Sequence, residues 1–222
     1  MFEKNKEFFK TEESERIEQI KVAIIGVGAL GQMAAHALVR SDVKTLFLMD
    51  PDRMEESNFN RQLYADTTHL GQYKVDVLKE ALEQIEPKIQ IQRIKCFLTK
   101  ENGIEHLKDA DVILDCVDDI YTKLILEEIA EHLGIVLIHG AVEGWYGQVA
   151  TVFPGDRILQ KLYPTTKKQI VSAHVGAVSI VASMQAMEVI KLAMGRGELI
   201  RHRVMFIDTL TNDYSYMNIA SE

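Results

Sequence analysis

The stretch NFNRQLYADTTHLGQYK, residues 58–74, holds two basic side chains, Arg61 and Lys74, among amides and hydroxyls. It follows soon after an apolar run that ends in Asp50. An Arg and a Lys together suit a highly charged ligand such as a triphosphate, because both donate charged hydrogen bonds to phosphate oxygens. Basic side chains more usually lie solvated on the surface, and spacing alone leaves that alternative open.

Two carboxylates, Asp118 and Asp119, end the apolar run LDCV of residues 114–117. Carboxylates repel phosphates unless a cation lies between them, and Mg²⁺ is bound by one or two carboxylates together with phosphate oxygens and water. Asp is also a favoured N-cap, and a helical pattern follows over 119–133. We expect one of the two to cap this helix and Asp118 to be the ligand of Mg²⁺.

The segment GVGALG, residues 26–31, matches the pattern G-x-G-x-x-G and lies between a strand pattern and a helical one. Gly26 permits a tight turn, Gly28 lets the backbone approach a phosphate, and Gly31 lets the helix pack on the strand. Asp50 ends the next strand pattern, where a carboxylate can bind ribose hydroxyls. The motif predicts a nucleotide site but does not separate a dinucleotide from ATP, and a tight turn without a ligand is the alternative.

A sheet must bring these segments together. Strands are predicted by apolar or alternating runs, and helices by apolar residues at helical spacing. The predicted strands are 21–26, 44–50, 89–96, 111–117, 134–140, 146–154, 202–207 and 213–218, and the predicted helices are 29–40, 72–86, 119–133 and 173–194.

Strands that alternate with helices predict an α/β fold. We expect a Rossmann-like, mostly parallel sheet with helices on both faces, followed by C-terminal antiparallel strands. Residues 1–20 are expected to form a polar helix or arm, and 21–222 a single domain. Because ligands of such sheets bind outside the carboxyl ends of the strands, the glycine turn, the segment after Asp50 and Asp118 should face one crevice.

Composition limits the class of protein. The net charge is −8, which argues against nucleic acid or an anionic membrane as the main partner. Only two cysteines are present, Cys96 and Cys116, and neither belongs to a C-x-x-C pair, so no structural zinc site is expected. The N-terminus has no signal-peptide pattern, and the apolar 173–194 run contains charges; we expect a cytoplasmic protein.

From about residue 20 to 210 the chain resembles the MoeB/ThiF/HesA family, relatives of the ubiquitin-activating enzymes. The resemblance lies in GVGALG, LMDPDRMEESNFNRQ, HLGQYKVDVLKEAL, LDCVDD, HGAVEGWYGQV and SMQAMEVIKLAMG, in this order. It implies adenylation, with ATP and Mg²⁺, of the C-terminal glycine of a ubiquitin-like sulfur carrier of MoaD or ThiS type. The pathways would be those of molybdopterin or thiamine, with a separate sulfur donor protein and a homodimeric enzyme.

The resemblance also implies the residues of the site. Asp50 would bind the ribose; Asn58, Arg61 and Lys74 would surround the triphosphate; and Asp118 would hold Mg²⁺. Arg61, Lys74 and Asp118 are the expected catalytic residues. The full expected nucleotide set is Gly26, Gly28, Ala29, Gly31, Asp50, Asp52, Ser57, Asn58, Arg61, Gln62, Lys74, Asp118 and Asp119.

The chain departs from the family pattern in four places. Ala29 stands where a second glycine is frequent, the zinc-binding C-x-x-C pairs are absent, and the crossover segment 155–170 has no cysteine that could form a thioester. The partner-inserting arginine motif is also absent, although Arg16 could substitute. These departures favour a compact, adenylation-only member. The 155–170 segment is expected to be a loop that lies over the carrier tail or stays on the surface.

Other interpretations remain open. They are an NAD-dependent oxidoreductase, a degenerate ATP-binding scaffold, and adenylation of another acid such as a tRNA base. Cys116, in a buried strand, is expected to be inert. His139 and His174 are interpreted as ordinary packed histidines, and Trp145 and Tyr146 as channel or packing residues. The methionines of the last helix, Met184, Met187 and Met194, are expected in the core or a dimer interface.

Overall fold

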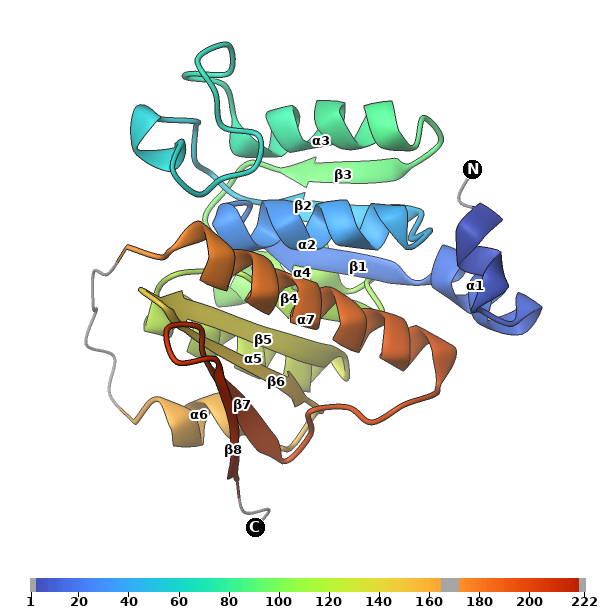
Figure 1. Ribbon diagram of the computed structural model, residues 1–222, viewed down its shortest axis with the longest axis vertical. Helices are drawn as coiled ribbons and strands as arrows, with labels where there is room; N and C mark the ends of the chain where they lie inside the picture. The colour runs from blue at the N-terminus through green and yellow to red at the C-terminus, as the bar shows by residue number, and fades with distance from the viewer. Residues whose placement is uncertain (1–2, 165–171, 220–222) are drawn as a thin grey trace.

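The protein is built on one twisted sheet, which runs in Figure 1 from β3 near the top to β8 near the bottom. The computed structural model describes residues 3–164 and 172–219. Within these residues the strand order is β3-β2-β1-β4-β5-β6-β7-β8. The strands are β1 Lys21–Ile25, β2 Thr45–Met49, β3 Gln90–Ile94, β4 Val112–Asp115, β5 Val136–Glu143, β6 Tyr146–Val152, β7 Arg203–Asp208 and β8 Asp213–Asn218.

The sheet has a parallel half and an antiparallel half. β1, β2, β3, β4 and β5 pair in parallel, with Ile24 opposite Leu48 on one side and Leu114 on the other. β6, β7 and β8 continue the sheet in antiparallel pairs. This arrangement confirms the expected fold class. The carboxyl ends of β1, β2 and β4 lie at the same edge of the sheet, and the predicted site segments begin there.

Helices cover both faces of the sheet (Figure 1). One face carries α1 Thr11–Gln19, α2 Ala29–Arg40, α3 Lys74–Ile85 and α7 Val175–Met194, and the other carries α4 Lys100–Leu107, α5 Ile120–Leu133 and α6 Ile158–Leu162. Among the described residues, the 3₁₀ turn η1 Glu3–Glu7 precedes α1, and the 3₁₀ turn η2 Glu56–Asn58 lies in the loop after β2.

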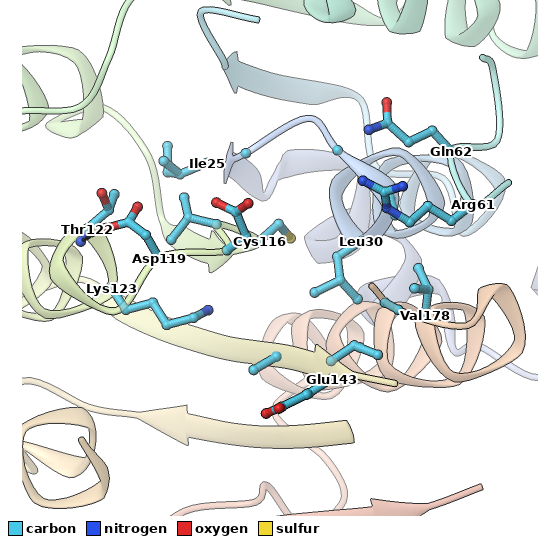
Figure 2. A pocket seen from close by; sticks show the side chains of 18 of the residues that line it. Ile25, Leu30, Arg61, Gln62, Cys116, Asp119, Thr122, Lys123, Glu143 and Val178 are labelled. Atoms are coloured by element: carbon cyan, nitrogen blue, oxygen red, sulfur yellow. Dashed lines mark hydrogen bonds between the residues drawn. The ribbon is translucent and has the colours of Figure 1, made fainter. Parts of the chain in front are cut away.

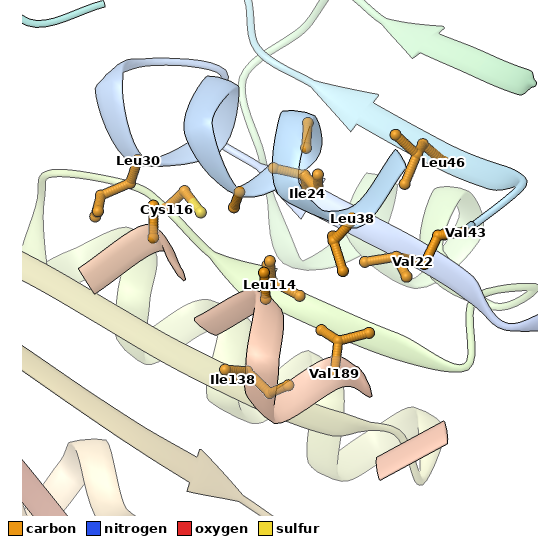
Figure 3. Close-up of a cluster of buried hydrophobic side chains, with 14 of the residues drawn as sticks. Val22, Ile24, Leu30, Leu38, Val43, Leu46, Leu114, Cys116, Ile138 and Val189 are labelled. Carbon is orange, nitrogen blue, oxygen red and sulfur yellow. The ribbon is translucent and has the colours of Figure 1, made fainter. Parts of the chain in front are cut away.

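The alternation of side chains along β1 shows why the sheet needs both layers. Val22 and Ile24 pack into the core beneath α2 and α7, whereas Ala23 and Ile25 pack beneath α5 on the other face. Figure 3 shows the first of these cores, where Leu38 of α2 meets side chains of the sheet. Full burial of an aliphatic side chain of this size contributes about 1.5–3 kcal/mol, so a two-sided strand contributes to two cores at once.

Helix α7 is the described helix long and apolar enough to cross a membrane by length and composition alone. Half of this apolar helix is buried inside the protein, against α2, β5 and β6. Its apolar sequence is therefore accounted for by packing on the sheet. Met184 and Met194 are partly buried there, as expected of core residues, whereas Met187 is exposed.

Two helices were not predicted. Helix α4 begins with a capping box formed by Thr99 and Asn102, a short signal that apolar periodicity does not reveal. The expectation of a loop over 155–170 was wrong in part, because residues 158–162 form α6. The cause is a distant side chain: Glu127 of α5 accepts hydrogen bonds from the backbone N–H groups of Leu159 and Gln160. Residues 165–171 lie outside the described residues.

Candidate nucleotide site

A cavity of about 1160 Å³ lies at the carboxyl ends of the parallel strands. It is larger than the roughly 300–1,000 Å³ of ordinary small-molecule pockets, so it can hold more than one small ligand. Figure 2 shows its wall, with side chains from several strand ends directed toward a common space. Twelve expected site residues line it: Gly26, Gly28, Ala29, Asp50, Asp52, Ser57, Asn58, Arg61, Gln62, Lys74, Asp118 and Asp119. Gly31 lies behind them.

The glycine turn between β1 and α2 shows a different use for each glycine. Gly26 has φ +89°, and a Cβ there would meet the carbonyl oxygen of Cys116 at 2.6 Å. A Cβ on Gly31 would lie 2.0 Å from the carbonyl oxygen of Gly26. Among the described residues, a Cβ on Gly28 would meet only the Gln62 side chain, at 3.8 Å. Gly26 and Gly31 are therefore required by the fold, whereas Gly28 keeps space open in the cavity.

The first turn of α2 is oriented toward this space. Gly28 is the N-cap residue, and no side chain of the described residues caps the helix. The N–H groups of an uncapped helix start, together with the helix dipole, favour an anionic group. The turn can therefore bind a phosphate with backbone atoms alone.

Asp50 joins the glycine turn to the loop that follows β2. Its two carboxylate oxygens accept hydrogen bonds from the N–H groups of Val27, at 2.6 Å, and Asp52, at 2.8 Å. Burial raises the pKa of Asp50, while the Lys74 charge and these N–H groups act in the opposite direction. Each oxygen has a further lone pair, so the carboxylate can also accept hydrogen bonds from two vicinal hydroxyls.

The two basic residues occupy different environments. Lys74, at the start of α3, is 7% exposed, and its Nζ lies 2.8 Å from an oxygen of Asp52. Arg61 is partly exposed and donates through Nη1 to the carbonyl oxygen of Ser57 at 2.8 Å and to Asn60 at 2.9 Å. A buried lysine at the cavity wall is not a solvated surface charge, which removes that alternative for Lys74.

The two amides of the same segment brace the loop. Asn58 accepts a hydrogen bond from the N–H of Glu55 at 3.0 Å, and Gln62 accepts one from the Gln32 side chain of α2 at 3.2 Å. Both residues are buried and both line the cavity. They hold the loop that carries Arg61 against α2.

The two carboxylates after β4 occupy different environments, and the expectation that one of them caps the following helix is confirmed. Asp119 is the N-cap of α5 and accepts a hydrogen bond from the N–H of Thr122 at 2.9 Å. Asp118 is exposed at the cavity, and no side-chain hydrogen bond or ion pair engages it among residues 3–164 and 172–219. No group of three or more His, Cys, Asp or Glu side chains in the described part could hold a metal ion. Any cation at Asp118 must therefore complete its coordination with ligand oxygens and water, as Mg²⁺ does beside phosphates.

A buried polar network lies under the floor of the cavity. Asp115, at the end of β4, accepts hydrogen bonds from Lys123 at 3.1 Å to each oxygen and lies 2.7 Å from Nδ1 of His139. Lys123 also donates to the carbonyl oxygen of Gly140 at 2.9 Å. Burial favours a neutral Asp115, but the Lys123 charge and His139 prevail and lower its pKa. Burial and the same charge lower the pKa of His139, so the pair is an ionised carboxylate and a neutral imidazole.

This network was not predicted from the sequence. His139 follows an apolar run and has no charged neighbour in sequence, and Lys123 and Asp115 are eight positions apart on different elements. His139 is packed, as expected, but it is also bonded to a carboxylate. His174 likewise has a structural role, because its ring caps α7 at the N–H of Gly176 and stacks on Trp145 at 4.3 Å.

Away from the glycine turn, the cavity continues between the β5–β6 hairpin and β7. Tyr146, Gln148, Tyr163 and Phe206 line this part. Of the two residues interpreted as channel or packing residues, Tyr146 lines the cavity and Trp145 is not among its lining residues. On the opposite side Met49, Phe97 and Leu98 give an apolar wall near Asp50 that suits the flat face of a base.

Cys116 does not resemble a nucleophile. Cys116 is 8% exposed, and burial, followed by the nearby Asp115 charge, raises the pKa of its thiol well above the ordinary value. A thiol that stays protonated is a poor nucleophile, as expected for an inert buried cysteine. Arg16 donates to the carbonyl oxygen of Met194 at the end of α7 that lies away from the cavity, so within one chain it does not reach the site.

Comparison with known proteins agrees with this geometry. A family model described as the ThiF family matches residues 3–222. The chain is 34% identical over 201 residues to a molybdopterin-synthase adenylyltransferase of Haemophilus influenzae, covering 87% of this chain and 83% of the relative. It is 30% identical over 220 residues to the Escherichia coli enzyme of the same name, covering 95% and 88%. A sulfur carrier protein adenylyltransferase of Thermus thermophilus is 27% identical, covering 94% and 82%.

Solved structures share the fold. E. coli MccB superposes with a TM-score of 0.85 at 17% identity, over 95% of this chain, and PaaA with a TM-score of 0.80 at 22% identity, over 93%. The chain spans 67% and 66% of these two longer proteins. The match of the family model across the described residues, together with the relatives at 30% identity or more, establishes the family: the chain belongs to the ThiF family.

Proposed function

We propose that this protein adenylates the C-terminal glycine carboxylate of a ubiquitin-like sulfur carrier with ATP and releases pyrophosphate. The observation that supports the proposal is that groups suited to phosphates and a group suited to a cation line the same cavity. The glycine turn, which no described side chain caps, and the buried Lys74 lie on one side, and the carboxylate of Asp118, which has no partner among the described residues, lies on the other. A nicotinamide cofactor needs neither Lys74 nor Asp118, so the NAD-dependent alternative is not favoured.

The residues match the charge requirements of the reaction. The carrier carboxylate attacks the α-phosphorus, a carboxyl oxygen–phosphorus bond forms, and the bond to the pyrophosphate oxygen breaks. A carboxylate is ionised at neutral pH, so no general base is needed. The barrier is the approach of an anion to a polyanion, and it is lowered by fixed positive charge. Lys74, Arg61 and the α2 N-terminus supply that charge at the phosphates.

The residues present fit ATP and Mg²⁺. Asp50 would accept the ribose hydroxyls, and Phe97 and Leu98 would contact the base. Asp118, without a protein partner among the described residues, would hold Mg²⁺ together with phosphate oxygens and water. When bound, Mg²⁺ supplies charge that offsets the repulsion between the carrier carboxylate and the phosphates.

The chain would stop at the acyl-adenylate. Cys116 is buried and protonated, and the described part of the crossover, residues 155–164, contains no cysteine. A separate protein would therefore supply the sulfur. The remaining parts of the proposal are a cytoplasmic homodimer, in which the exposed Met187 of α7 contacts a second copy, and no nucleic acid or membrane partner.

The test is ATP–pyrophosphate exchange with a panel of MoaD-like and ThiS-like carriers. The wild-type protein should catalyse exchange only when a carrier is present. Asp118→Asn should reduce the rate by on the order of 10²–10³, the effect of removing one charged group from an electrostatic site, and Arg61→Ala should reduce it sharply. The matched control is Asp109→Asn, which removes an exposed carboxylate just before β4, at the opposite end of the same strand.

Other outcomes identify the alternatives. ATP binding without exchange for every carrier would indicate a degenerate scaffold. Micromolar NAD binding without ATP binding would indicate an oxidoreductase. Equal losses in Asp118→Asn and Asp109→Asn would mean that Asp118 has no special role in the site.

A further inference from the structure

Tyr163 places a hydroxyl in the part of the cavity that the nucleotide does not need. It follows α6 and lines the cavity beside Gln148 of β6. Its oxygen lies 2.8 Å from Oε1 of Gln148 and 3.2 Å from Nε2 of His139. Tyr163 thereby connects the cavity surface to the buried Asp115–Lys123 pair; Figure 2 shows Lys123 extending from α5 toward β5.

The chain of hydrogen bonds fixes the direction of each proton. Asp115 is held ionised by Lys123, so it must receive the Nδ1 proton of His139 at 2.7 Å. A neutral His139 then has a bare lone pair on Nε2. Tyr163 faces two acceptors, this lone pair and the carbonyl oxygen of Gln148, and it has a single proton to donate to them.

The consequence is that Tyr163 offers only an acceptor to the cavity. Its proton is directed into the wall, and no group among the described residues donates to its oxygen. A ligand that meets this oxygen must bring a donor. The carboxylate of Asp208 also lines this part of the cavity, so a second anionic group on the ligand would be repelled.

We propose that the oxygen of Tyr163 accepts a hydrogen bond from a backbone N–H of the polypeptide tail being adenylated, and so selects a peptide tail over a small carboxylic acid. The inference rests on the proposed function. It names the positioning role of a residue that the nucleotide site does not use. His139, Asp115 and Lys123 act behind it by holding the Tyr163 proton inward.

The test combines one enzyme variant with a modified carrier. A carrier that supports exchange with the wild-type protein is prepared by ligation, and each of its last few amide bonds is replaced in turn by an ester, which lacks the N–H. With the wild-type protein, one ester position should raise the KM for the carrier about fivefold to tenfold, the size expected of one hydrogen bond. Tyr163→Phe should raise the KM of the unmodified carrier by a similar factor and abolish the effect of that ester.

A contact of this kind leaves the other kinetic constants alone. The kcat and the KM for ATP should change by less than about twofold in Tyr163→Phe. The matched control is Tyr64→Phe, which removes a hydroxyl that also bonds a histidine, His36 at 2.6 Å, but does not line the cavity. It should leave every constant unchanged.

The outcomes are distinct. If Tyr163→Phe leaves the carrier KM unchanged, if its effect adds to that of every ester, or if no ester affects the wild-type protein, the contact is overturned and the adenylation proposal stands. If the wild-type protein shows no exchange with any carrier, the proposed function is overturned, and this contact with it.

Discussion

Lys74 shows how one side chain can be held ready for a ligand. Its side chain is almost completely buried, yet Asp52, the carboxylate that pairs with it among the described residues, has a side chain that is 56% exposed. An ammonium group has three donors, and the described residues engage one of them. A buried charge with unused donors is costly unless another anion shares it. The residue is therefore suited to a phosphate that arrives beside Asp52.

At the same scale, Gly28 and Gly31 should respond differently to one added methyl group. Gly31→Ala places a Cβ 2.0 Å from a carbonyl oxygen, so we expect a loss of about 1–3 kcal/mol in the free energy of unfolding, measured by urea denaturation. Gly28→Ala meets no close protein atom at an ordinary φ of −83° and should fold normally. Its methyl group would occupy space for a phosphate, so the ATP dissociation constant should rise on the order of tenfold.

The two variants control each other. For each variant, calorimetry gives the dissociation constant of ATP and urea denaturation gives the free energy of unfolding. Equal losses of stability, or unchanged ATP affinity in Gly28→Ala, would contradict the assignment of Gly31 to the fold and Gly28 to the ligand.

Among the elements, α6 depends on a residue of another helix. Glu127 of α5 accepts the N–H groups of Leu159 and Gln160 and so takes the place of an N-cap. Glu127→Ala should lower the free energy of unfolding by about 1–3 kcal/mol, because two backbone donors lose their partner. The neighbouring Glu128, which pairs with Lys100 on the surface, is the matched control. Its replacement by Ala should change stability by less than about 0.5 kcal/mol in the same denaturation assay.

Whether an element is stabilised by nearby or by distant residues decides whether it could be predicted from the sequence. Strands β1, β2 and β4 were predictable to within two residues at each end, because apolar runs that end in Gly26, Asp50 or Asp118 are local patterns. Helix α6 was not, since its N-terminus is satisfied by a residue about thirty positions earlier. For the same reason the capping role of Asp119 was predictable, whereas the bond between His139 and Asp115 was not, as it joins two neighbouring strands.

In the whole molecule, both layers of helices converge on the cavity. α2 and α3 bring the glycine turn and Lys74 from one face, while α5 brings Asp119 and Lys123 from the other. The sheet between them ends at the same edge, so the site is formed by both cores together. A change that loosens either core should therefore also alter the cavity.

The stability of the whole molecule should depend on pH through two histidines. Burial, together with the Lys123 charge, lowers the pKa of His139; burial, together with Arg40, lowers the pKa of His36. Because the pKa values of both histidines are lower in the folded protein than the value of about 6.5 in the unfolded chain, the two rings are neutral in both states above pH 6.5. The free energy of unfolding therefore has its full value there. Below that pH, the unfolded chain binds protons that the folded chain refuses, and the free energy of unfolding falls by up to about 1.4 kcal/mol per pH unit for each histidine.

Urea denaturation between pH 7.5 and 5 measures this slope. The Asp115 pKa is also lowered, but from the ordinary range of a carboxyl group, so its contribution is lost only at more acidic pH. His36→Gln and His139→Gln should each reduce the slope between pH 6.5 and 5, and the double variant should reduce it further. A slope that is the same in all four proteins would show that neither ring stays neutral in the folded state. The Tyr163 proton would then not be directed into the wall, because that direction requires the bare Nε2 lone pair of a neutral His139.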